Sequence, residues 1–333
     1  MSQSSSTPSH GLYPWHEQQW AFILRCLDMD RLAHALIIEG PSGCGKTAFA
    51  NNMAAKLLCG ADQPQACGQC RSCQLLAGED RAHPELMDIS FEINPKTGKL
   101  RTEITVDQVR KLIGQLQLTN TISARKVAFI HPADALNKSA ANALLKSLEE
   151  PAGKDTVLIL VTDDPGRLPV TVRSRCQLIS IGQPDREVVQ AWLQQVSDQD
   201  GEAVNAAIDA AGGSPLRAAQ FLQSPELDAF TQVRESLATL LSRPASAMAV
   251  SERLAKLDEK DIWRWLSSCC SDVVRASMRG QTPGWMPANI QLDSKTLLQL
   301  QKQADINRRM STTPVRSDLL LQAWLIGWAE QGI

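Results

Sequence analysis

The chain has 333 residues, enough for two or three domains, and its 43% hydrophobic and 21% charged residues are ordinary for a globular protein. The net charge is -2, whereas proteins that make extensive phosphate contacts along nucleic acid are strongly basic. Any DNA contact should therefore be local or shared with partners. The sequence has no apolar run of about 18 residues and no apolar signal segment after the polar residues 2–9. We therefore expect a cytoplasmic protein without a membrane span.

The first part of the chain, to about residue 180, alternates short apolar runs with helical patterns, which is typical of a parallel α/β sheet. We expect buried strands over residues 35–38, 127–130, 157–161 and 177–181, and helices over 47–58 and 139–150. Another helix should begin after Thr105, which has the spacing of a capping box with Gln108.

No strand pattern follows Pro184, and the rest of the chain has helical periodicity with a break at residues 212–215. The fold class is therefore α/β plus all-α. We expect three domains: an α/β domain over 1–182 with a cysteine module at 59–73, a small helical domain over 183–224, and a helical domain over 225–333.

The segment after the first expected strand matches the phosphate-binding pattern G-x-x-x-x-G-K-[ST] and leads into a helix, as that pattern requires. It consists of Gly40, Pro41, Ser42, Gly43, Cys44, Gly45, Lys46 and Thr47. The glycines let backbone N–H groups face an anion, Lys46 would reach the outer phosphates, and Thr47 would hold Mg²⁺. The sequence leaves open whether ATP or ADP with Mg²⁺ binds there, and a glycine-rich turn without a ligand is the alternative.

The strand over 127–130 lacks the carboxylates of a working ATPase. Such an enzyme needs an aspartate at this strand end to hold Mg²⁺ and usually a glutamate to activate water. His131 and Pro132 stand there instead, and neither replaces those groups. We therefore predict that this chain does not hydrolyse ATP. In the contrary interpretation, Asp134 on the following turn or Asp163 substitutes.

Four cysteines predict a structural zinc site. Cys59, Cys67, Cys70 and Cys73 lie within a short polar window, and the C-x2-C spacing suits a tetrahedral Zn²⁺. In an intracellular chain such thiols favour metal binding over disulfides. The fourth ligand could instead be His83, and scattered core thiols are the alternative to a metal site. No ligand position is left open, so the zinc would be structural.

Together these features resemble the clamp-loader branch of the AAA+ superfamily over roughly residues 12–225. The resemblance is carried by residues 32–36, the phosphate loop, the cysteine insert, His83-Pro84, residues 104–110, the Ala-Asn-Ala-Leu-Leu-Lys segment within 140–151, and Arg-Ser-Arg-Cys at 173–176. It implies an AAA+ P-loop domain, a helical lid and a C-terminal helical collar. It also implies that Arg175 is an arginine finger acting in trans, that Thr162 stands at the family's polar sensor, and that Arg217 stands near its sensing arginine.

The resemblance further implies a function and partners. The chain would be a subunit of a bacterial clamp loader, a hetero-pentamer with gamma/tau and delta subunits that loads the sliding clamp onto primed DNA and belongs to a DNA polymerase holoenzyme. The main alternative is an active gamma/tau-like motor ATPase. A zinc-dependent DNA-binding protein is disfavoured by the near-neutral charge, and a small-molecule P-loop kinase lacks a recognisable acceptor site.

Overall fold

The computed structural model describes residues 11–78, 82–95, 97–151, 155–224, 226–242, 245–287, 290, 292–310 and 316–332. The chain forms two compact units, one ending at Pro184 and the other beginning at Asp185. Pro225, where we expected a further boundary, lies outside the described residues, so the division of the helical part into two domains stays a prediction.

The first unit contains a parallel five-stranded sheet in the order β2-β3-β4-β1-β5, which confirms the expected α/β class. The strands are β1 (Ala35–Glu39), β2 (Leu86–Ile89), β3 (Lys126–Ile130), β4 (Thr156–Thr162) and β5 (Gln177–Ser180). In the middle of the sheet, Ile37 is in register with Leu160 on one side and with Leu178 on the other. The chain leaves β1 at its carboxyl end, where open α/β sheets bind ligands.

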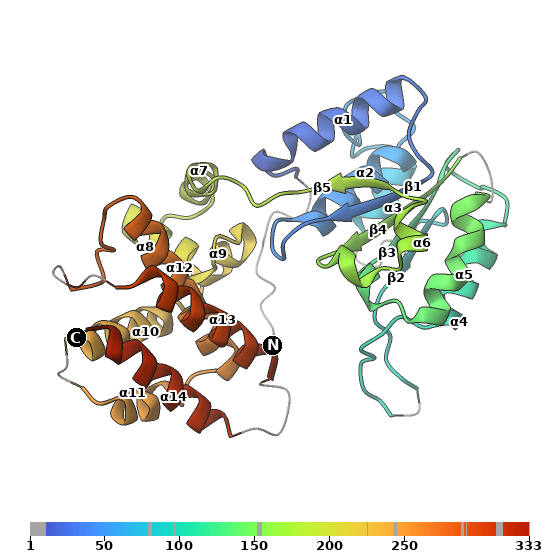
Figure 1. Ribbon diagram of the computed structural model, residues 1–333. Coiled ribbons are helices and arrows are strands. Elements are labelled where there is room, and N and C mark those ends of the chain that lie inside the picture. Colours follow the sequence, from blue (N-terminus) through green and yellow to red (C-terminus); the bar gives the residue numbers. More distant parts are fainter. Residues whose placement is uncertain are drawn as a thin grey trace. The chain divides into compact units, whose positions relative to one another are not determined.

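Helices cover both faces of this sheet (Figure 1). They are α1 (Glu17–Asp28), α2 (Lys46–Leu58), α3 (Arg71–Ala77), α4 (Val106–Leu116), α5 (Lys138–Glu149) and α6 (Val170–Arg173). Leu36 and Ile38 pack in one core with α1, α2 and α3, whereas Ala35 and Ile37 pack in the other with α4, α5 and α6. This alternation buries β1 on both faces and explains its continuous apolar sequence. The capping box of Thr105 and Gln108 is present at the start of α4.

Strand β2 was not expected from the sequence. It has only four residues, carries Asp88 in its middle, and pairs with β3 alone at one edge of the sheet. Met87 and Ile89 are buried whereas Asp88 between them is exposed, because successive side chains point to opposite faces of the sheet. The short run Leu-Met-Asp-Ile therefore gave too weak a pattern.

Within its described residues the second unit consists of helices and the segments that connect them, without a strand. Its helices are α7 (Arg186–Val196), α8 (Gly201–Ala210), α9 (Pro215–Phe221), α10 (Glu226–Leu241), α11 (Ala247–Leu254), α12 (Glu259–Met278), α13 (Ser294–Met310) and α14 (Ser317–Ala329). Trp263, Trp265 and Trp328 are almost fully buried in it. Asp209 joins three helices, because its carboxylate pairs with Arg186 at 2.5 Å and Arg234 at 2.9 Å. None of the described helices in either unit is long and apolar enough to cross a membrane.

Candidate nucleotide and metal sites

The phosphate loop connects the carboxyl end of β1 to the first turn of α2. Gly45 is the N-cap residue of α2 and has a left-handed backbone with φ +82°, which favours glycine. Gly40 lies so close to the segment directly after β5 that a Cβ atom at Gly40 would overlap the carbonyl oxygen of Ile181. Larger side chains at these two positions would therefore be sterically unfavourable. The glycines allow the tight backbone turn in which N–H groups can surround an anion.

Aromatic residues before α1 contact the backbone of this loop. The Trp15 Nε1 and His16 Nε2 atoms both lie 2.9 Å from the carbonyl oxygen of Cys44, and both donate to it. The Tyr13 ring packs where a Cβ of Gly45 would lie. Sequence reasoning missed these contacts, although the cluster of aromatic side chains directly before the first helix was a visible signal.

The His16 side chain is fully buried, and its second nitrogen, Nδ1, has no hydrogen-bond partner. Because Cys44 offers only an acceptor, the neutral ring must carry its proton on Nε2. Burial lowers the pKa of His16 below its ordinary value, with a smaller opposing effect from the Cys44 carbonyl. His16 is therefore neutral when it supports the loop.

Lys46 is buried and already has a counter-charge. Its Nζ atom lies 2.6 Å from an oxygen of Asp163 and donates to the Pro41 carbonyl at 2.7 Å. The Lys46 side chain is 4% exposed, whereas that of Asp163 is 55% exposed. A buried ammonium group needs a negative partner, and in this structure the carboxylate after β4 supplies it.

The polar groups beside this pair come from two strand ends. Thr162, the last residue of β4, donates its hydroxyl to Asp134 at 2.9 Å. Asp134 lies on the turn after β3, as the sequence predicted, and also lies 3.7 Å from Arg167. Thr47 and Ser42 are exposed on the loop. The structure therefore gathers Lys46, Asp163, Thr162 and Asp134 near the same edge of the sheet.

The end of β3 itself offers no carboxylate. His131 turns toward the edge strand, where its Nε2 lies 3.4 Å from Asp88, and its ring packs against that of Phe129 with centroids 4.6 Å apart. Pro132 follows and has no acid–base group. The two positions at which an ATPase carries its metal-holding and water-activating carboxylates are thus occupied by groups engaged elsewhere or inert.

The four cysteines come together in one cluster, and their sulfur atoms all lie within 4.8 Å of one another. The Cys59–Cys70 and Cys67–Cys73 sulfur distances are both 3.9 Å. Tetrahedral zinc with Zn–S bonds of about 2.3 Å places its sulfurs about 3.8 Å apart, so the cluster fits such an ion. Backbone N–H groups of Gln69 and Cys70 lower the pKa of Cys67 to about 6, which favours the thiolate, whereas burial raises the pKa of Cys73 to about 12.

His83 lies outside this cluster. Its Nδ1 accepts from the backbone N–H of Glu85 at 3.2 Å, and its Nε2 lies 3.4 Å from the Ser123 hydroxyl. Desolvation lowers the pKa of His83, so the buried ring is neutral. Cys59 completes the sulfur cluster in its place, and His83 instead takes part in the buried contacts that support the module.

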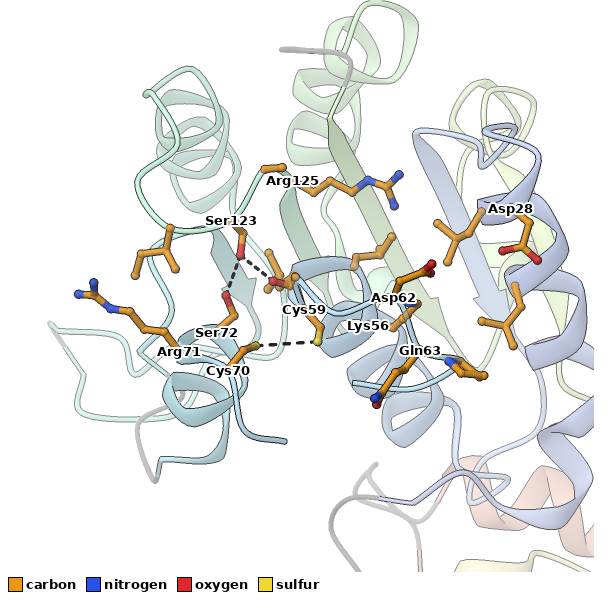
Figure 2. Close-up of a pocket in the computed structure, with 18 residues that line it drawn as sticks. Asp28, Lys56, Cys59, Asp62, Gln63, Cys70, Arg71, Ser72, Ser123 and Arg125 are labelled. Atoms are coloured by element: carbon orange, nitrogen blue, oxygen red, sulfur yellow. Dashed lines mark hydrogen bonds between the residues drawn. The ribbon is translucent and has the colours of Figure 1, made fainter. Parts of the chain in front are cut away.

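Figure 2 shows how the cysteine module joins the sheet domain. The Ser72 and Ser123 hydroxyls lie 2.9 Å apart, and Ser123 also donates to the carbonyl of Leu58 at 2.7 Å. A cavity of about 820 Å³ opens beside these residues, between the end of α1, the cysteine module and residues 122–125, away from the phosphate loop. Its described lining mixes basic and acidic groups and so favours no particular charge of ligand.

Arg175 lies on the turn after α6. Its Nε donates to Glu149 at 2.8 Å, and its Nη2 lies 2.5 Å from the same carboxylate oxygen. Its Nη1 donates to the carbonyl of Thr171 at 2.9 Å. The Arg175 side chain is one-third exposed, so these contacts hold it in place without burying it.

Arg217 belongs to the second unit. It donates to Asp261 at 3.0 Å, and its guanidinium lies over the Phe221 ring at 5.3 Å. These contacts explain its position by packing within the helical unit. A nucleotide-sensing role for Arg217 stays a prediction.

Comparison with known proteins gives a consistent match. A family described as "DNA polymerase III, delta subunit" matches residues 15–185, which include the phosphate loop, the cysteine module and Arg175. The DNA polymerase III subunit delta' of Pseudomonas aeruginosa is 32% identical and covers 96% of this chain and 98% of its own length. The subunit of the same name from Escherichia coli K12 is 31% identical over 79% of this chain and 76% of its own length. The subunit gamma/tau of Mycobacterium tuberculosis is 31% identical over 57% of this chain and 32% of its own length.

Proposed function

Because the chain belongs to the clamp-loader family of DNA polymerase III delta' subunits, we propose that it serves as a non-hydrolysing subunit of a bacterial clamp loader. Its partners would be gamma/tau and delta subunits, and the assembly would place a sliding clamp on primed DNA. The observation that carries this proposal is the match to a delta' subunit over nearly the whole of both chains. The gamma/tau relative matches over little more than half of this chain.

We propose that Arg175 is the residue through which this chain contributes to ATP hydrolysis. It would act on a nucleotide bound by a neighbouring subunit. A guanidinium donates paired hydrogen bonds to phosphate oxygens and stabilises charge in the transition state. Such an arginine supplied in trans accelerates some NTPases by about 10³-fold or more. The exposure of Arg175 and its fixed position after α6 support this role.

The chain's own phosphate loop would not hydrolyse ATP. His131 and Pro132 stand where carboxylates are needed, and His131 is engaged with Asp88. The intact loop still supports nucleotide binding, in which Lys46 would contact phosphates and Thr47 would hold Mg²⁺. A bound nucleotide would then stabilise the domain.

We also propose that Cys59, Cys67, Cys70 and Cys73 hold a structural Zn²⁺ ion. The sulfur distances fit tetrahedral coordination, and four thiolates leave no position for substrate. The ion would fix the module to the end of α2, where Ser72 and Ser123 connect it to the sheet domain.

The role of Arg175 is tested in a clamp loader reconstituted with gamma/tau and delta subunits. Arg175→Ala should lower DNA-stimulated ATP turnover, while the complex still assembles. Arg175→Lys should restore little, because an ammonium group keeps the charge but loses the planar pair of donors. Unchanged turnover with Arg175→Ala would remove the proposed role in trans.

A further inference from the structure

The contacts of Arg175 point to a second residue in the same function. α5 and α6 lie next to each other in the first unit (Figure 1). Glu149 is the last residue of α5, and its carboxylate oxygen contacts both Nε and Nη2 of Arg175. The two residues are 26 positions apart in sequence, so only the packing of the two helices brings them together.

Both ends of this pair rest on rigid structure. α5 buries Leu144 and Leu148 in the core beneath it, and Val172 of α6 is buried in the same core. Glu149 and Arg175 therefore project from elements whose positions are fixed by packing, and the ion pair connects their exposed tips. A long arginine side chain would otherwise sample many rotamers around its rotatable bonds.

The contacts leave a usable edge of the guanidinium. Nε donates to Glu149, and Nη1 donates to the Thr171 carbonyl. Because each Nη atom carries two N–H groups, Nη1 and Nη2 each keep one further donor. A guanidinium with donors left on both Nη atoms can form paired hydrogen bonds to a phosphate.

Helix stability does not explain Glu149. A carboxylate in the last turn of a helix is electrostatically unfavourable, because the helix C-terminus carries a partial negative charge. Glu150 follows directly and adds a second negative charge at the same end. The Arg175 contact offsets this disadvantage for Glu149, and within the described residues Glu150 forms no ion pair with Arg175.

We infer that Glu149 is a positioning residue, which orients the Arg175 guanidinium so that its free edge faces the phosphates of a neighbouring subunit's nucleotide. This inference rests on the proposed role of Arg175. The carboxylate also offsets part of the positive charge of Arg175. Both side chains are at least one-third exposed, so solvent screens this charge effect.

The test compares Glu149→Ala, Glu149→Gln and the matched control Glu150→Ala in the reconstituted clamp loader, with Arg175→Ala setting the floor of DNA-stimulated ATP turnover. Glu149→Ala should remove roughly half or more of the turnover that Arg175→Ala removes. The reason is that displacing a reacting group by about 1 Å can lower the rate by up to about 10²-fold. The loss should appear in kcat, with KM for ATP near the wild-type value. Glu149→Gln should lose less, because its amide oxygen still accepts from Nε, and Glu150→Ala should match wild type.

A double variant separates positioning from a structural role. If Glu149 acts only through Arg175, then Glu149→Ala combined with Arg175→Ala should give the turnover of Arg175→Ala alone. The melting temperature of Glu149→Ala should stay near that of wild type, because the lost Arg175 contact and the lost unfavourable charge at the helix C-terminus offset each other. An additional loss in the double variant would overturn the inference.

Two other outcomes are equally decisive. Wild-type or higher turnover with Glu149→Ala, together with a clear loss for Arg175→Ala, would leave the arginine finger intact and refute the positioning role. No effect of Arg175→Ala would refute the proposed function itself and the positioning role with it.

Discussion

Asp163 and Lys46 form an ion pair at the place where the phosphate loop would meet a nucleotide. Pro41 and Asp163 take two of the three N–H donors of Lys46, so a phosphate would share the ammonium group with the Asp163 carboxylate. The two negative groups would then compete for the same positive charge. The strength of the ion pair is modest, because more than half of the Asp163 side chain is exposed.

The first prediction concerns this competition. Asp163→Asn should tighten binding of a fluorescent ATP analogue by roughly three- to tenfold, which corresponds to about 0.7–1.4 kcal/mol. Titration of the purified chain in the presence of Mg²⁺ measures the effect. Asp164→Asn is the matched control, because Asp164 caps the next turn through Gly166 and does not contact Lys46 in the described structure. Weaker, Mg²⁺-dependent binding by Asp163→Asn would instead identify Asp163 as the missing metal-holding carboxylate.

The second prediction concerns His16. Its folded pKa is lowered by burial, so the unfolded chain takes up a proton below the ordinary value of about 6.5 while the folded chain resists it. This contribution to stability is therefore complete above pH 6.5 and is lost as the pH falls below that value. The slope for one proton is at most about 1.4 kcal/mol per pH unit.

Denaturant unfolding at pH 7.5 and at pH 5.5 measures this effect. The free energy of unfolding should fall by about 1 kcal/mol more in wild type than in His16→Gln between these two values. Gln retains a donor for the Cys44 carbonyl but does not titrate. Equal falls in both proteins would show that His16 does not govern this pH dependence.

At the scale of elements, the sequence predicted those strands and loops whose formation depends on a local residue pattern. β1, β3 and β4 are buried between two helical layers and are rich in apolar residues, so each was expected. β5 was also expected, although only Ile179 of its four residues is buried. The phosphate loop was predicted because its glycine spacing is a local requirement. β2 was missed because it has only four residues and the exposed Asp88 interrupts its apolar sequence.

Contacts between distant segments could not be predicted in the same way. The Trp15 and His16 contacts to Cys44 join residues 28 or 29 positions apart, and the Glu149–Arg175 pair spans 26. Such contacts depend on how helices pack on the sheet, and no periodicity in the sequence records that packing. The choice of Cys59 over His83 likewise depends on the buried partners of His83, which the spacing alone does not reveal.

The third prediction belongs to the cysteine module. Purified wild type should contain about one zinc ion per chain, and Cys70→Ser should lose it, because zinc in a structural site needs four ligands. Loss of the ion should lower the melting temperature, since the binding free energy of a structural zinc ion contributes to folding. Metal analysis and thermal unfolding measure both effects. Cys26→Ser, which lies on α1 outside the cluster, should keep the zinc. A wild-type protein without zinc, or a Cys70→Ser variant that retains it, would refute the site.

At the scale of the whole molecule, the two units carry different kinds of residue. The sheet unit holds the phosphate loop, the four cysteines and Arg175, whereas the helical unit holds buried tryptophans and the Asp209 network. The proposed chemistry therefore lies in the first unit. Within that unit, the loop that would bind nucleotide lacks the carboxylates for hydrolysis, and the arginine that would assist hydrolysis is oriented by Glu149.

The most direct test of this account is ATP turnover by the isolated chain and by the reconstituted clamp loader, each with wild type and Lys46→Ala. We predict no turnover by the isolated chain. A clamp loader containing Lys46→Ala should keep most of its DNA-stimulated turnover, because hydrolysis would take place at the neighbouring subunits. Clear turnover by the isolated wild-type chain that Lys46→Ala abolishes would contradict the account and identify the chain as a motor ATPase.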